Sequence, residues 1–178
     1  MRGDQGGEGM NDFKGIEATS EFGRWVGDEY VTDFTDAYTQ DDHDKVRDLL
    51  VGHAVVKVAD DHLQLDDGTL LKFVGHEGGC ACSAGDYDLT ALNGVENVIT
   101  GVEFDDSPGG DDAVCPTCGK DYCYEDGHES RFDGAYRIFV FAGDQRINLA
   151  TFEGSDGNGY YGTGYYVLVR RPVKEAAR

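Results

Sequence analysis

A short run of candidate metal ligands constrains this chain more than any other feature. The segment CPTCGKDYCYEDGH contains Cys115, Cys118, Cys123 and His128. Zinc binds thiolate sulfur and imidazole nitrogen in tetrahedral sites whose ligands are closely spaced along the chain. Because four protein ligands fill such a site, no position remains for a substrate or an activated water. The spacing therefore predicts one structural Zn²⁺ ion that folds a loop and does not catalyse a reaction.

Two zinc patterns resemble this spacing, and each matches only in part. Cys115 to Gly119 is similar to one half of a zinc ribbon, but only one such half is present. The order C-x2-C-x4-C-x4-H resembles a zinc knuckle in which the last two ligands are exchanged. Zinc knuckles bind single-stranded nucleic acid through aromatic and basic side chains. Here Lys120 is surrounded in sequence by carboxylates, so the knuckle-like loop does not favour nucleic acid.

Other uses of the cysteines remain open. Plain reduced or disulfide-bonded cysteines are one alternative, and a redox C-x-x-C is another. The redox motif needs a preceding strand and a following helix, which the residues after Cys118 do not supply. A second group, His76 with Cys80 and Cys82, could bind another metal ion or provide a reactive thiol. Burial of small cysteines in the core would explain the same residues without chemistry.

The charge of the chain limits its partners. The net charge is −20, with 35 acidic and 15 basic residues among 178. Such a surface repels a phosphate backbone, so nucleic acid is an unfavourable partner. Solubility, adaptation to salt and mimicry of nucleic-acid charge are competing explanations for the acidity. The absence of a long apolar run or a signal-peptide core, together with an odd cysteine count, predicts an intracellular protein that does not span a membrane.

The first part of the chain is predicted to be helical. Residues 1–12 are polar and are expected to be disordered, and residues 13–52 form the predicted N-terminal helical arm. Within the arm, one helix is predicted from apolar residues at helical spacing, namely Tyr30, Val31, Phe34 and Tyr38. A second helix is predicted to begin near Asp41 and Asp42, which can cap it, and to bury Val46, Leu49 and Leu50.

Over residues 53–171 apolar residues tend to recur at every second position, which predicts a β domain. HAVVKVAD, HLQL and TLLKFV are expected to form a three-stranded meander, with His53 and His62 as structural histidines beside it. Further strands are predicted at residues 95–104, 136–141, 146–152 and 164–170, and one helical turn at residues 88–92. Residues 107–133 are too long for a structureless loop, so they are predicted to be an inserted metal-binding loop. Residues 172–178 form a basic tail.

The predicted fold is therefore mainly β, as a small antiparallel sheet, barrel or sandwich, with an N-terminal helical arm and an inserted zinc-knuckle-like loop. Several motifs carry a further resemblance: VGHAVVKV, LQLDDGTLLKF, the Cys80-Ala81-Cys82 step and the Gly157-Asn158-Gly159-Tyr160-Tyr161 hairpin. Over about residues 49–170 the chain resembles a family of uncharacterised domains found chiefly in bacteriophages and also in some bacteria. The 107–133 loop departs from that family pattern and has the character of an insertion. The resemblance implies a phage or prophage context and a small β-rich fold, without any catalytic residue.

Together these observations predict a non-enzymatic, phage-associated protein-binding or virion-associated module with one structural Zn²⁺ ion. Its expected location is the cytoplasm of a bacterial host or the virion, and its expected partner is a phage or host protein. One alternative is an acidic inhibitor that mimics nucleic acid and blocks a host nucleic-acid enzyme. Another is a metal- or thiol-dependent enzyme, which predicts an open coordination position or an unusually reactive Cys80 or Cys82.

Overall fold

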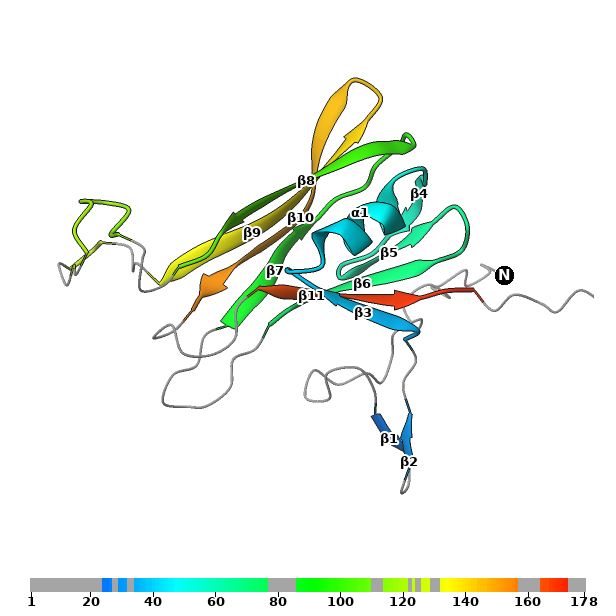
Figure 1. Cartoon of the computed structure of the whole chain (residues 1–178), viewed down its shortest axis with the longest axis horizontal. Helices are drawn as coiled ribbons and strands as arrows, with labels where there is room; N and C mark the ends of the chain where they lie inside the picture. Colours follow the sequence, from blue (N-terminus) through cyan, green and yellow to red (C-terminus); the bar gives the residue numbers. More distant parts are fainter. Residues whose placement is uncertain are drawn as a thin grey trace, which may run out of the picture.

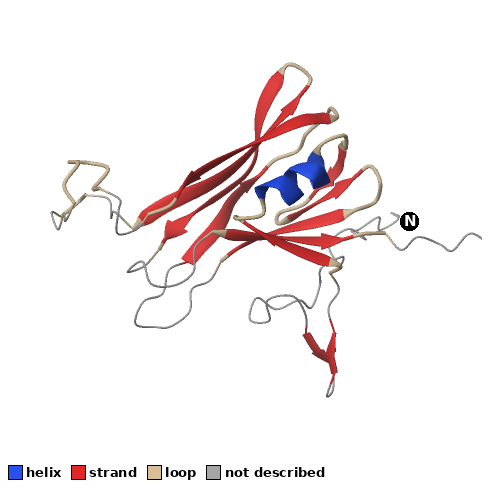
Figure 2. Ribbon diagram, in the orientation of Figure 1, coloured by secondary structure: helices blue, strands red, loops and turns tan. Residues whose placement is uncertain are grey.

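The chain folds mainly into antiparallel β-sheet, which confirms the predicted fold class. The computed structural model describes residues 34–76, 86–109, 114–121, 123, 126–128, 132–156 and 164–172, and the backbone of two short strands at 24–26 and 29–31. In this part of the chain, two larger sheets and one short helix form the body of the protein (Figure 1, Figure 2). The two short strands, β1 (Arg24–Val26) and β2 (Glu29–Val31), pair with each other.

Each of the two larger sheets is formed by antiparallel neighbours. The five-stranded sheet has the order β3-β11-β6-β5-β4, with β3 at Asp36–Thr39, β4 at Val55–Val58, β5 at His62–Leu65, β6 at Leu70–Gly75 and β11 at Tyr165–Arg170. The four-stranded sheet has the order β7-β10-β9-β8, with β7 at Asp86–Leu92, β8 at Ile99–Ser107, β9 at Asp133–Ala142 and β10 at Gln145–Ser155. The predicted meander β4-β5-β6 is confirmed, as are the strands β9, β10 and β11.

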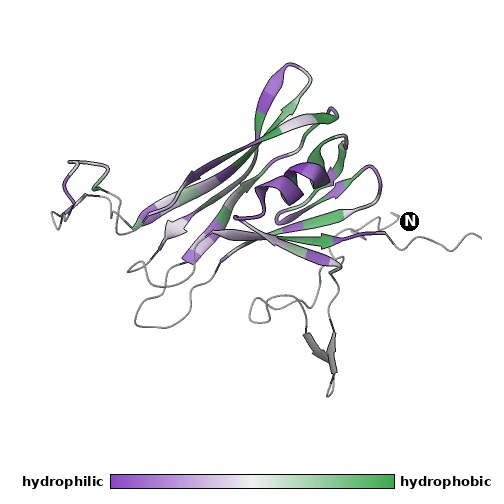
Figure 3. Ribbon diagram, in the orientation of Figure 1, coloured by the Kyte–Doolittle hydropathy of each residue, from purple (hydrophilic) through white to green (hydrophobic). Residues whose placement is uncertain are grey.

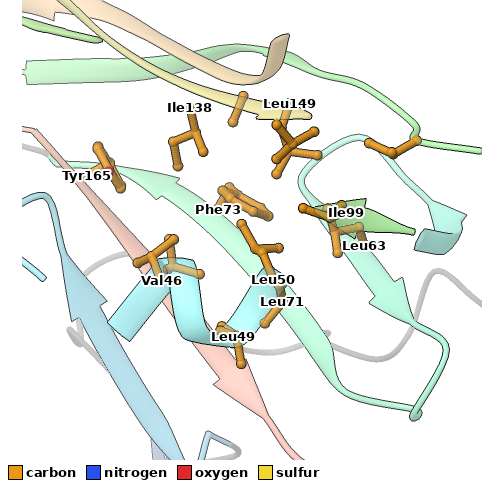
Figure 4. Packing of buried hydrophobic residues seen from close by; sticks show 14 of the residues in the cluster. Val46, Leu49, Leu50, Leu63, Leu71, Phe73, Ile99, Ile138, Leu149 and Tyr165 are labelled. Carbon is orange, nitrogen blue, oxygen red and sulfur yellow. The ribbon is translucent and has the colours of Figure 1, made fainter. Parts of the chain in front are cut away.

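The hydrophobic core lies between the two sheets. Ile138 and Leu149 from the four-stranded sheet approach Phe73 and Leu63 from the five-stranded sheet (Figure 4). All four side chains are at most 1% exposed. Because side chains alternate along a strand, one face of each strand supplies this core while the other faces outward. Figure 3 shows hydrophobic and hydrophilic residues interspersed along the strands, and a helix whose residues are mostly hydrophilic.

The helix α1 (His43–Leu50) lies between the edge strands of the two sheets. It contacts β8 and β3, and its buried residues Val46 and Leu50 point into the shared core (Figure 4). This confirms the second predicted helix and its apolar face. The helix has 8 residues, and no helix among the described residues has the length and apolar character needed to cross a bilayer.

The predicted capping of α1 is only partly correct. The carbonyl of Asp42 accepts the first helical hydrogen bond, from the Val46 N–H at 3.0 Å, but the Asp42 side chain makes no bond to the helix N-terminus. Its carboxylate instead accepts the Thr39 N–H at 3.0 Å and the Lys45 ammonium at 2.6 Å. The side chain therefore fixes the connection between β3 and α1 rather than the free N–H groups of the helix.

Replacing Asp42 with alanine is expected to lower the free energy of unfolding by about 1 kcal/mol, chiefly through the lost bond to the Thr39 N–H. The hydrogen bonds from Lys45 and Thr39 lower the pKa of Asp42. A lowered native pKa gives a contribution that is present above the ordinary pKa of aspartate and is lost as the pH falls through the native value. The difference between wild type and Asp42→Ala in urea unfolding should therefore shrink in acid. Asp41→Ala, next to it, should be nearly neutral at either pH.

Two predicted helical segments are strands, and these predictions were wrong. The helix expected over residues 29–38 is replaced by β2 and β3, so the predicted arm contributes a strand to the five-stranded sheet. In β3, Tyr38 packs against the main core while Ala37 packs against a second cluster on the other face, which is a period of two. The helical turn expected at residues 88–92 is part of β7, which pairs with β10 and contains a register shift that obscures its alternation.

Candidate metal centre

The four predicted ligands converge on one point. The ligand atoms of Cys115, Cys118, Cys123 and His128 all lie within 4.8 Å of one another. His128 Nδ1 lies 3.1 Å from Cys123 Sγ and 3.8 Å from Cys115 Sγ. In a tetrahedral zinc site, bonds of about 2.3 Å to sulfur and about 2.0 Å to nitrogen place these donors roughly 3.5 Å apart. The cluster is therefore compatible with a four-coordinate metal site, as the spacing predicts.

The backbone of the segment bends so that its ligands meet. The Gly119 N–H donates to the Cys115 carbonyl at 2.8 Å, and the Cys115 N–H donates to the Lys120 carbonyl at 2.9 Å. Gly119 has a φ of 72° and Gly127, just before His128, has a φ of 84°. These left-handed values favour glycine, which lacks the Cβ that makes them unfavourable. Gly119 thus provides a tight turn directly after Cys118.

The environment of Cys115 favours its thiolate form. Cys115 is 1% exposed, Cys118 is exposed and Cys123 is half-buried. Burial by itself raises the pKa of the Cys115 thiol, but hydrogen bonds from the backbone N–H groups of Cys118 and Thr117 and from the neighbouring thiols outweigh it and bring the pKa to about 6. The thiolate is the form of cysteine that binds metal ions.

A family comparison places this site within a known domain. Residues 48–167 match the family described as Domain of unknown function (DUF7448), which is well over half of the 178-residue chain. The chain belongs to the DUF7448 family. The match begins within α1 and ends within β11, so the cysteine segment lies inside it. No curated protein and no solved structure matches the chain. The sequence resemblance to an uncharacterised domain family is confirmed to this extent.

In this DUF7448 domain the cysteine segment leaves and re-enters the fold at one place. It projects from the ends of β8 and β9, away from α1 (Figure 1). A Cβ atom added at Gly109, just after β8, would overlap the backbone of Phe132, just before β9. A Cβ at Gly134 would likewise overlap the Gly109 nitrogen. Close packing of the two backbones therefore requires glycine at both positions, which form the root of the cysteine segment. The segment has the geometry of an insertion between two paired strands.

A buried tyrosine and a buried aspartate hold this root of the DUF7448 domain. The Tyr87 hydroxyl donates to Asp156 Oδ1 at 2.6 Å, and the Asp156 N–H donates to the Phe132 carbonyl at 2.8 Å. Burial raises the pKa of Asp156, and the bond from Tyr87 partly offsets that rise. Sequence reasoning missed this pair because its members lie 69 positions apart and form no short motif.

The structure describes only one member of the second predicted site. His76 lies just after β6, its ring is 5.6 Å from that of Tyr166, and its buried Nδ1 makes no hydrogen bond among the described residues. Cys80 and Cys82 lie outside the described residues. The prediction that these three bind a metal ion, or that a cysteine here is reactive, therefore stays a prediction. His62 is a buried structural histidine, as expected, with Nδ1 2.9 Å from Asp61.

Proposed function

We propose that this DUF7448 protein is a non-enzymatic, phage-associated protein-binding or virion-associated module, in which residues 107–133 are folded around one structural Zn²⁺ ion. The observation that carries this proposal is the convergence of three cysteines and one histidine on one point. Four protein donors complete a tetrahedral shell, whereas a catalytic zinc keeps a position for water or substrate. The donor set therefore favours a structural ion over a catalytic one.

The inserted segment at residues 107–133, called the excursion below, also has little buried apolar surface around which to fold. Among its described residues at 114–121, 123 and 126–128, Cys115 alone is buried, and Val114 is 48% exposed. A segment that buries so little apolar surface does not offset the conformational entropy lost on folding. The binding free energy of a structural metal ion can supply this stabilisation, as it does in small zinc domains.

The proposed partner is a phage or host protein. The net charge of −20 disfavours nucleic acid and favours a protein with a basic binding surface. The excursion extends from the sheets and is therefore accessible to such a partner (Figure 1). The phage context rests on the resemblance of residues 49–170 to phage domains, and the proposed location follows from it: the cytoplasm of a bacterial host or the virion.

Native mass spectrometry of the chain from its natural host, combined with metal analysis, tests both parts of this proposal. The expected result is one zinc ion per chain, lost in strong chelator, and a co-purifying protein of phage or host origin. A chain without metal, or with a disulfide among Cys115, Cys118 and Cys123, would contradict the structural zinc. Recovery of a nucleic-acid enzyme whose binding weakens steeply with salt would instead support the acidic-inhibitor alternative.

A further inference from the structure

A second group of side chains that could hold a metal ion lies apart from the cysteine segment and contains no sulfur. It consists of His53, between α1 and β4, and Asp66 and Asp67, in the turn between β5 and β6. One ligand atom from each residue lies within 4.8 Å of the others. The sequence predicts His53 only as a structural histidine, and Asp66 and Asp67 belong to no metal-binding motif, so the sequence alone does not indicate this grouping.

The backbone holds all three side chains in place. The Asp66 N–H donates to the Ala54 carbonyl at 2.9 Å, which ties the turn to the residue after His53. The Thr69 N–H donates to Asp67 Oδ1 at 2.9 Å, and Gly68 has a φ of 86° that permits the tight turn. The His53 carbonyl accepts the Ile99 N–H at 2.8 Å. The donors are therefore attached to a hydrogen-bonded framework and not to free loops.

A structural role for the histidine explains only part of this arrangement. His53 Nδ1 lies 2.7 Å from Asp66 Oδ1, which is a hydrogen bond that satisfies one carboxylate. Asp67 Oδ2 lies 4.0 Å from His53 Nε2, which is beyond hydrogen-bond distance. A second carboxylate thus faces the imidazole at ion-pair distance, while its other oxygen accepts the Thr69 N–H. Two carboxylates this close to one imidazole provide the negative charge and the oxygen donors that attract a divalent cation.

A small cleft adjoins the group. Its volume is about 200 Å³, and His53 and Asp67 line it together with Asp48 of α1. Lys45 and Arg171 line the same cleft. An ion at His53 and Asp67 would therefore keep positions open to water or to a small anion, and Asp48 is within the same cleft as a further oxygen donor. This differs from the cysteine centre, whose four protein donors complete the shell.

We propose that His53, Asp66 and Asp67 bind a divalent transition-metal ion through one nitrogen and two oxygen donors, with exchangeable ligands in the adjoining cleft. Imidazole together with carboxylate suits Mn²⁺, Fe²⁺, Ni²⁺ and Zn²⁺, whereas thiolate-rich sites select softer ions. The two proposed sites can therefore be distinguished by the ion that each prefers. Zinc is expected to stay at the cysteines, while Mn²⁺ binds at the histidine and the aspartates. Because part of its coordination shell is open, this site would exchange ligands with solvent more readily than the cysteine site.

Titration of the full, zinc-loaded chain with Mn²⁺ tests the proposal, followed by paramagnetic broadening of amide NMR signals and by the electron paramagnetic resonance of free Mn²⁺. The expected result is saturable binding of one ion, with selective broadening around residues 52–54 and 66–69. His53→Gln and Asp67→Asn should each weaken binding by about ten-fold or more, since removing a supporting partner of a metal ligand already costs that much. Both side chains are partly exposed, so neither change disturbs the core.

The matched control is Asp86→Asn, on the exposed end of β7 and outside the group. This variant should bind Mn²⁺ as the wild type does. Broadening spread over the acidic surface, with equal affinity in all four proteins, would show only diffuse counterion attraction and would overturn the proposal, as would the absence of binding. Because binding is read from signals around residues 52–54 and 66–69, these outcomes do not depend on whether the cysteine segment binds zinc.

Discussion

Serine in place of Cys118 is expected to abolish stoichiometric zinc binding and to release the 107–133 excursion, while both sheets remain folded. Cys118 is exposed, so the change removes no packing from the core. A serine hydroxyl does not replace a thiolate as a zinc ligand. Structural zinc ions bind zinc-finger peptides with about 10–16 kcal/mol of free energy. This free energy is far larger than the stabilisation that the little apolar surface buried by the segment's described residues could provide.

Limited proteolysis and amide hydrogen exchange measure this outcome. Cleavage should become rapid within residues 107–133, whereas exchange in β9 and β10 should be unchanged. Thr117→Ser, in the same turn but not a ligand, should behave as wild type, and Cys118→His should recover part of the zinc affinity because imidazole is a zinc ligand. Strong chelator should reproduce the serine variant in the wild-type chain.

The place where the excursion joins β8 and β9 explains why both sheets should stay folded. Gly109 and Phe132 lie against each other, and β8 and β9 pair directly up to Ser107 and Ala135. The strands therefore remain joined whether or not the excursion is ordered. Global unfolding of Cys118→Ser would show instead that the metal centre belongs to the core and that the insertion hypothesis is wrong. Unchanged protease resistance would show that no metal folds the segment.

The features that sequence could predict are local ones. The ligand spacing from Cys115 to His128 identifies the candidate metal centre because all four donors come from one short segment. The alternation in β4, β5 and β6 predicts a meander because each strand pairs with its neighbour in the chain. In both cases the interacting residues are close in sequence, so their pattern is visible without knowledge of the fold.

The features that sequence missed depend on distant partners. β3 was predicted as helix, since its apolar residues also fit a helical period, and its strand conformation comes from pairing with β11, more than a hundred residues later. The pair of Tyr87 with Asp156, 69 positions apart, likewise forms only when distant strands are placed together. Such polar residues show no hydrophobic periodicity, so in the sequence they cannot be told from ordinary turn or strand residues.

The second large effect is expected at the buried pair beneath the excursion. Tyr87→Phe should lower the free energy of unfolding by about 1.5–3 kcal/mol at neutral pH, because Asp156 is 4% exposed and loses its hydroxyl donor. Tyr165→Phe is the matched control. Tyr165 is fully buried as well, but its hydroxyl makes no hydrogen bond among the described residues, so its removal should be neutral or stabilising.

The pH dependence separates this role from simple packing. Burial raises the pKa of Asp156, so between its ordinary pKa and the native value the folded chain binds more protons than the unfolded chain, and the stability contributed by this group falls as the pH rises through that window. Without the Tyr87 hydroxyl the native pKa rises further. The deficit of Tyr87→Phe should therefore be larger at neutral pH than in mild acid, where Asp156 is protonated in the folded chain. In an Asp156→Asn background, the cost of Tyr87→Phe should no longer vary with pH. A cost that stays the same across pH in both backgrounds would mean that the hydroxyl contributes only packing, and that Asp156 does not hold the root through this bond.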